Sequence, residues 1–130
     1  MSDTTCTVIK GTKVYQSNLN GLRPLMNWLN NDPDVLKDSY VIDKVIGKAS
    51  ALLLTYGKAA KVHGITMSKA AVKVLEENHI EYSYDTLVDF IENQTKTGMC
   101  PMEMKVADIE EPEKAYQTFR DFFASMQKQN

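Results

Sequence analysis

Apolar residues in the first part of the chain follow two different spacings. Two short runs rich in β-branched residues, 5–10 and 12–16, flank Gly11 and predict a β-hairpin with a tight turn. Apolar residues within 22–29 then recur at helical spacing. Because proline is tolerated only in the first helical turn, this helix is expected to begin within a few residues before Pro24.

A wide apolar face occupies the centre of the chain. It predicts one helix that runs through Gly47, stops at Gly57 and has Asp43 or Ser39 as its N-cap. Its apolar residues are Val45, Ile46, Ala49, Leu52, Leu53 and Tyr56. Glycine inside a helix costs about 1 kcal/mol relative to alanine, so a close backbone approach is expected at Gly47. Residues 59–65 follow as a predicted buried strand.

The second half of the chain also alternates between helix and strand patterns. Ser68 is the expected cap of a helix whose apolar residues lie within 71–75. The period-two pattern of 80–84 predicts a strand. Asp85 is then expected to cap a short helix or irregular segment over 87–91.

Two further helices are predicted near the end of the sequence. Pro101 begins a short helix that reaches about Ala107, and the acidic, proline-containing stretch 110–113 opens the last helix. A hairpin followed by alternating helices and strands implies a sheet with parallel members and helices on both faces. We therefore expect residues 1–130 to form a single α/β domain.

Composition excludes several classes of function. The chain is 43% hydrophobic and 25% charged, as in soluble globular proteins. A net charge of −2 favours neither nucleic acid nor an anionic membrane as a partner. No apolar run approaches the roughly 18 residues of a membrane span, and residues 1–5 do not resemble a signal peptide. Cys6 and Cys100 are therefore expected to be free thiols in a reducing cytoplasm.

The stretch 95–103 holds the strongest candidate for chemistry. Pro101 suits the first helical position, which makes Cys100 the N-cap and Glu103 the third helical residue. An N-cap cysteine faces unpaired N–H groups and the positive end of the helix dipole, which favours the thiolate. Glu103 is expected to reach back to the N–H of Cys100, as in a capping box. The alternative is a structural, buried thiol at a well-capped helix.

Other chemical signals are sparse. The backbone around Thr97 and Gly98 suits a close approach to a phosphate or a carboxylate. The sequence contains no Cys-x-x-Cys, His-x-Glu or helical histidine pair, so neither a metal nor a cofactor is expected. His63 with Cys100 is the candidate Cys–His pair. A Ser–His–Asp arrangement stays open, because such groups meet only in space.

Two stretches, 48–57 (KASALLLTYG) and 97–103 (TGMCPME), resemble an uncharacterised bacterial family. That family is grouped with the cytidine-deaminase-like fold but lacks the zinc site of the deaminases. The resemblance runs from about Cys6 to Phe123, and TGMCPME is its most specific part. It implies a three-layer α/β/α sandwich around a mixed, largely five-stranded sheet.

The same resemblance argues against zinc chemistry. Deaminases of this superfamily carry His-x-Glu or Cys-x-Glu at the start of one helix and Pro-Cys-x-x-Cys at the start of the next. The corresponding regions here are 43–45 and 68–73. They contain none of the three metal ligands and no proton-shuttling glutamate, so zinc-dependent deamination is not expected.

The implied fold places two helix N-termini around one cleft, which is a natural pocket for an anion or a nucleotide. The candidate ligand-binding residues are Asp43, Lys44, Lys48, His63, Thr97, Gly98 and Cys100. The expected function is binding of a small nucleoside- or nucleotide-like molecule. One alternative is a thiol-based enzyme that uses Cys100 and Glu103. Another is a structural or protein-interaction module, such as a homodimer.

Overall fold

The N-terminal hairpin forms as predicted. The computed structural model describes residues 4–93, 95 and 98–128. Strand β1 (Cys6–Lys10) pairs antiparallel with β2 (Lys13–Ser17), and Gly11 in the turn has a φ of +61°. Glycine adopts this left-handed conformation without the steric cost that a side chain brings. The β-branched runs and the turn glycine therefore suffice to specify this element.

Five strands form one mixed sheet in the order β2-β1-β3-β4-β5. Strands β3 (Tyr40–Ile46), β4 (Lys61–Ser68) and β5 (Glu81–Val88) are parallel to one another, and β1 is antiparallel to β3. The predicted α/β class and the mixed five-stranded sheet are thus confirmed.

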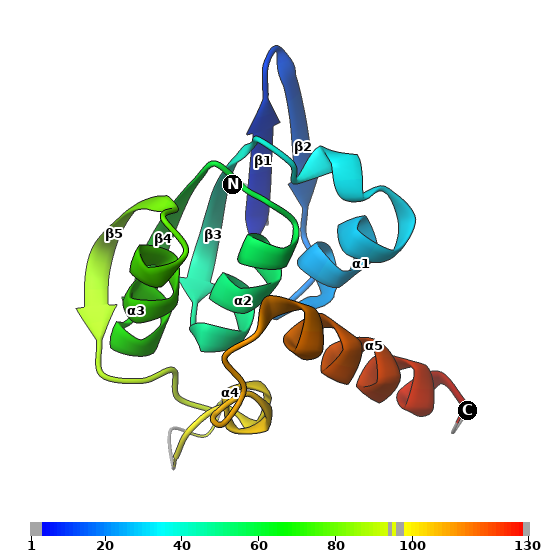
Figure 1. The fold of residues 1–130 in the computed structure, drawn as a ribbon, viewed down its shortest axis with the longest axis vertical. Coiled ribbons are helices and arrows are strands. Elements are labelled where there is room, and N and C mark those ends of the chain that lie inside the picture. Colours follow the sequence, from blue (N-terminus) through cyan, green and yellow to red (C-terminus); the bar gives the residue numbers. More distant parts are fainter. Residues whose placement is uncertain (1–3, 94, 96–97, 129–130) are drawn as a thin grey trace.

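The helices pack over one face of this sheet. Figure 1 shows α1 (Arg23–Asn31), α2 (Lys48–Tyr56) and α3 (Lys69–Glu77) in a row in front of the strands, with α5 (Pro112–Lys128) against α2. The crossovers β3–α2–β4 and β4–α3–β5 step across the sheet in the same direction. Because such crossovers are right-handed, both helices lie on the same face.

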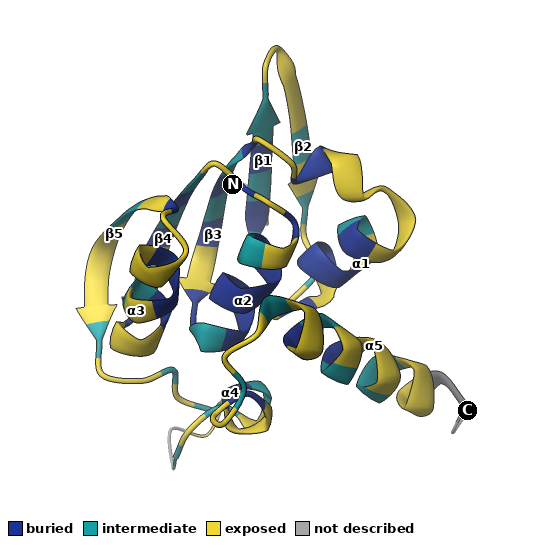
Figure 2. Cartoon of the chain, in the orientation of Figure 1, coloured by how far each residue is buried: buried dark blue, intermediate teal, exposed yellow. Residues whose placement is uncertain are grey.

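The expected helical layer on the opposite face is not formed by the described residues. Val41 and Val62 on the covered face are fully buried, whereas Ile42 and His63 on the other face remain half-buried. In Figure 2 burial is concentrated on α2 and on the strands behind it. The three-layer prediction was therefore wrong in this respect, because α5 adds its layer outside α2 rather than behind the sheet.

The predicted helix through Gly47 was also wrong. Residues up to Ile46 form strand β3, and Gly47 is the N-cap of α2 in an extended conformation. Neither Asp43 nor Ser39 is the cap. Residues 49–54 are all buried, because α2 lies between the sheet, α3 and α5. A helix that is apolar on every side has no clear stripe, so its start could not be separated from the preceding apolar strand.

The region after α3 is partly as predicted. Ser68 caps α3 by accepting a hydrogen bond from the N–H of Ala71 at 3.1 Å. Strand β5 continues in register with β4 as far as Val88, and residues 89–91 are irregular, so of the two alternatives for 87–91 the short helix was wrong. Pairing with a neighbouring strand overrode the local capping signal of Asp85.

The last two helices begin at the predicted prolines. Helix α4 (Pro101–Lys105) is shorter than expected, and a short 3₁₀ turn, η1 (Pro33–Val35), follows α1. Among the described residues, no helix combines the length and the apolar character needed to cross a membrane.

Candidate functional site

Glu103 lies at the edge of the sheet where the parallel strands end and α2 begins. Its side chain comes from α4 and is 8% exposed. Its carboxylate accepts hydrogen bonds from the N–H of Lys48 at 2.7 Å and from the N–H of Ala49 at 2.8 Å. The first N–H groups of a helix lack partners within the helix and carry partial positive charge. Glu103 therefore closes the anion-binding end of α2 from 54 or more residues away in the sequence.

Gly47 makes room for this contact. A Cβ at Gly47 would lie 2.8 Å from Oε2 of Glu103 and closer still to Oε1. Neither oxygen can retreat without losing its hydrogen bond to α2. The close approach expected at this glycine is real, but the group that approaches is a side-chain carboxylate rather than a backbone.

The predicted capping box at α4 was wrong. The N–H of Cys100 donates to the carbonyl of Ile91 at 2.8 Å, while the carboxylate of Glu103 is on α2. Cys100 is the N-cap of α4 and is half-buried, but its side chain makes no cap hydrogen bond. Helix α4 has only 5 residues, which leaves little macrodipole to stabilise a thiolate.

Burial raises the pKa of Glu103 above its ordinary value. The N–H groups of Ala49 and Lys48 and the charge of Lys48 act in the opposite direction without cancelling the effect of burial. The Lys48 ammonium is itself engaged, since it donates to the carbonyl of Ala107 at 3.0 Å and forms an ion pair with Glu110 at 3.2 Å. Lys48, which was expected to bind a ligand, and Glu103, which was a catalytic candidate, are therefore both engaged in contacts within the protein.

Two hollows flank Glu103. One, of about 230 Å³, lies towards α3, and Phe90 and Met99 contribute to its walls. These two side chains are 43% and 39% exposed. Asp89, at its rim, forms an ion pair with Lys69 at 2.8 Å. The other hollow, of about 100 Å³, lies towards α1 and includes Cys100.

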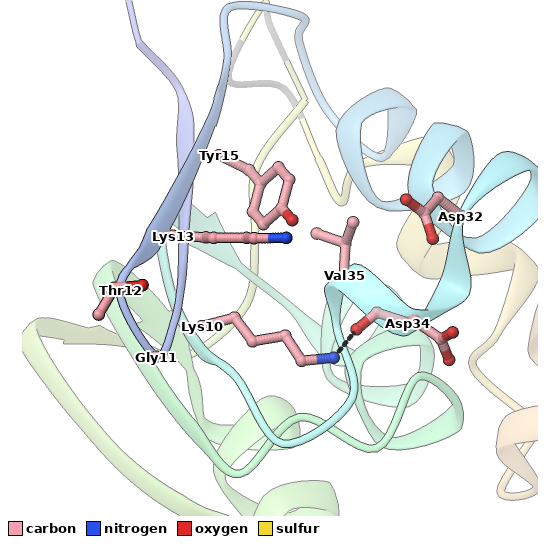
Figure 3. A pocket seen from close by; sticks show the side chains of 8 residues that line it. All are labelled: Lys10, Gly11, Thr12, Lys13, Tyr15, Asp32, Asp34 and Val35. Atoms are coloured by element: carbon pink, nitrogen blue, oxygen red, sulfur yellow. Dashed lines mark hydrogen bonds between the residues drawn. The ribbon is translucent and has the colours of Figure 1, made fainter.

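A further hollow of about 460 Å³ separates the hairpin from η1. Figure 3 shows Lys10, Lys13 and Tyr15 on the hairpin side, with Asp32 and Asp34 on the other. Lys10 donates to the backbone carbonyl of Asp34. Both aspartates and Lys13 are exposed, which is typical of a solvated surface with offsetting charges. None of the sequence-predicted site residues lines this hollow.

Asp43 does not line either hollow beside Glu103. It is 6% exposed, and the nearby backbone N–H groups of Val45 and Lys44 and the thiol of Cys6 act to lower its pKa without cancelling the effect of burial. Its Oδ2 atom is buried without a hydrogen-bond partner among the described residues. Burial raises the pKa of Asp43 to about 7. Burial, together with the charge of Asp43, also raises the pKa of Cys6 well above its usual range.

The other candidates are dispersed. Lys44 is exposed, Gly98 is half-buried, and Thr97 lies outside the described residues. His63 forms a hydrogen bond through Nδ1 with Oγ of Ser83 at 2.6 Å, and its Nε2 lies 3.3 Å from Oδ1 of Asp85. Both ring nitrogens are thus committed to β5, and the proposed pair with Cys100 is not formed.

Phe90 and Met99 at the hollow, and Ser83 and Asp85 beside His63, were not among the residues predicted for a site. Ser83 and Asp85 are two positions apart, which places them on one face of a strand, and this spacing was visible in the sequence. The exposure of Phe90 and Met99 was not visible, because it depends on how the segment before α4 folds back. Within the described part of the chain, no group of three or more His, Cys, Asp or Glu side chains is arranged to hold a metal ion.

Comparison with known proteins places the chain in a family without assigning an activity. The profile of TM1506, a domain of unknown function (DUF1893), matches residues 1–123. The crystal structure of a DUF1893 family protein (TM1506) from Thermotoga maritima is similar, with 29% identity and a TM-score of 0.84. The match covers 92% of this chain and 80% of that one. No curated protein matches. The chain therefore belongs to the DUF1893 family, an uncharacterised family as the sequence resemblance implied.

Proposed function

We propose that this protein binds a small, flat, uncharged ligand of the nucleobase or nucleoside class. The binding site is the hollow of about 230 Å³ between the N-terminal ends of α2 and α3. The observation that carries the proposal is the exposure of Phe90 and Met99 on its walls.

The position of the hollow favours a ligand site. It lies beyond the carboxyl ends of parallel strands, as Ser68 at the end of β4 contributes to its wall. Ligands of open α/β sheets bind preferentially at this edge. The volume is below the roughly 300–1,000 Å³ of pockets for drug-sized ligands, which limits the occupant to a small molecule.

The apolar walls favour a planar ligand. Phe90 offers an aromatic face and Met99 a polarisable thioether, and both types of side chain pack well against flat rings. A heterocycle that stacks on Phe90 would also shield apolar surface that is now in contact with water. This arrangement supports the nucleoside-like ligand expected from the family resemblance.

The charges argue against a phosphate on that ligand. Glu103 already accepts hydrogen bonds from the first N–H groups of α2, and Ser68 accepts one at the start of α3, so these donors are occupied. Lys48 is paired with Glu110, and Lys69 is paired with Asp89. A phosphate in the hollow would lie close to the carboxylate of Glu103 without a free helix terminus to compensate. The ligand class is therefore narrowed from nucleotides to nucleosides and bases.

Calorimetric titration with matched bases, nucleosides and nucleoside monophosphates tests this proposal. We expect binding of at least one base or nucleoside and weaker binding of its monophosphate. Phe90→Ala should weaken binding about tenfold, in line with the loss of one stacked base. Met104→Ala is the control, since Met104 is 59% exposed on α4 and does not line the hollow. Equal losses in the two variants, or no binding across the panel, would contradict the proposal.

The alternatives from the sequence stay predictions. A thiol-based enzyme at Cys100 does not have His63 as its base, because that side chain lies against Ser83 and Asp85. A protein-interaction module, a homodimer and a cytoplasmic location are not tested by the fold. For none of these alternatives does a specific contact offer support comparable to the exposed Phe90 and Met99 of the hollow.

A further inference from the structure

The open face of the sheet carries a polar cluster that is separate from the ligand hollow. His63 on β4 pairs in register with Ser83 on β5, and Asp85 is the next residue of β5 on that face. The side chain of His63 is 19% exposed, and that of Asp85 is 60% exposed. Lys61 and Glu81 form an ion pair one step back along the same two strands. The described helices cover only the opposite face, so solvent reaches the cluster.

The contacts place an imidazole between a hydroxyl and a carboxylate. The Oγ of Ser83 lies 2.6 Å from Nδ1 of His63, and the Oδ1 of Asp85 lies 3.3 Å from Nε2. The carboxylate of Asp85 beside Nε2 favours the tautomer with the proton on Nε2. Nδ1 then has its lone pair free to accept the Ser83 proton. A nucleophile, a base and an orienting carboxylate in contact are the geometric mark of an activated serine, whatever their order in the sequence.

From this geometry we infer that Ser83 is an activated nucleophile that accepts acyl groups from small, reactive esters. Oγ of Ser83 forms a bond to the ester carbonyl carbon while its proton passes to Nδ1 of His63. The bond from that carbon to the leaving oxygen then breaks, and the leaving group takes the proton from Nδ1. The products are an ester of Ser83 and a free alcohol or phenol. Asp85 acts through His63 and is a positioning residue.

The surroundings define the class of substrate. Ser83 lies on an exposed sheet face, and it does not line any of the hollows described above. A surface of this kind offers little binding energy to a large substrate, so reactivity must come from a good leaving group. Aryl esters with short acyl chains meet this requirement.

Acylation by 4-nitrophenyl acetate tests the inference, with release of 4-nitrophenol followed by absorbance and the modified peptide located by mass spectrometry. We expect acetyl on Ser83. His63→Asn should slow this modification about a hundredfold, the lower range for general base catalysis. Ser125→Ala should leave it unchanged, because Ser125 is an exposed serine on α5.

Two further variants separate positioning from structural support. Asp85→Asn should slow acetylation of Ser83, and Asp85→Glu should restore most of the rate, while both unfold at the wild-type temperature. Since Asp85 is mostly exposed, these variants keep the inference testable even if His63→Asn does not fold. Acetylation confined to lysines or cysteines, or a Ser83 rate unchanged in Asp85→Asn, would overturn it.

Discussion

Among the described residues two carboxyl groups are buried, and they differ in how their oxygens are satisfied. Glu103 receives one backbone N–H on each oxygen at the positive end of α2. Asp43 lies on β3 opposite Cys6 of β1, and its Oδ2 has no partner among the described residues. Burial raises the pKa of both, to about 7 in Asp43. Glu103 is thus a bridge between α4 and α2, whereas Asp43 is a carboxyl that the fold favours in its neutral form.

The difference shows that burial alone does not decide the role of a carboxyl group. The carboxylate of Glu103 accepts two backbone N–H groups that an amide cannot both satisfy, whereas the orphaned Oδ2 of Asp43 has no hydrogen bond to lose. Substitution by the amide should therefore have opposite consequences at the two positions. The experiments below test that contrast, from the largest expected effect to the smallest.

The largest effect concerns the pH dependence of stability at Asp43. The pKa of Asp43 is raised in the folded protein. Its contribution to the free energy of unfolding is therefore complete below the unfolded pKa near 3.8 and declines as the pH rises towards 7. We expect the free energy of unfolding to fall by up to roughly 4 kcal/mol over this window, at about 1.4 kcal/mol for each pKa unit. Urea unfolding between pH 4 and 8 measures the change.

Asp43→Asn is the matching variant for that titration. An amide carries no charge, so the difference in stability between variant and wild type should move in favour of the variant as the pH rises. Above pH 7 this difference should level off. Parallel pH profiles for the two proteins would show that Asp43 does not titrate in this range.

The next effect concerns the space that Gly47 leaves for Glu103. Gly47→Ala should displace the carboxylate from the N–H groups of Lys48 and Ala49 and lower stability by about 3 kcal/mol. Once Glu103 is shortened to alanine, the added methyl group has room, and Gly47→Ala should then cost about 1 kcal/mol or less. Chemical denaturation of the two single variants and the double variant forms the required cycle. Additive losses would mean that the two residues act independently.

The smallest effect is the amide substitution at Glu103. Glu103→Gln keeps one oxygen acceptor but places an NH₂ group against a backbone N–H of α2. We expect a loss of about 2 kcal/mol at pH 8, where Asp43→Asn should be neutral or stabilising. If urea unfolding at this pH showed that both amide variants change the free energy of unfolding in the same direction, the contrast between the two carboxyl groups would be removed.

Local signals in the sequence predicted the elements whose causes are local. The hairpin turn at Gly11, the cap at Ser68 and the helix starts at Pro101 and Pro112 each depend on a few neighbouring residues. The boundary at Gly47 was misread, because apolar residues run continuously from β3 into the buried helix α2. Periodicity is lost when a helix is enclosed on all sides.

The candidate site was predicted in part. Residues 99–103 and Lys48 do come to the N-terminal end of α2, and Cys100 lines one of the two hollows there. The predicted hydrogen-bond partner of Glu103, the N–H of Cys100, was wrong. A capping box and a long-range contact to another helix require the same residue types. Only the packing of α4 against α2 selects between them.

The sequence by itself determined the α/β class, the family and the absence of the deaminase zinc motifs, since these depend on composition, alternation and short strings of residues. Tertiary structure decided which face of the sheet is covered, which carboxyl closes α2, and which residues His63 meets. These outcomes depend on crossover handedness, strand register and packing between distant segments. Residues 20 or more positions apart meet in each contact, and no local pattern encodes such a meeting.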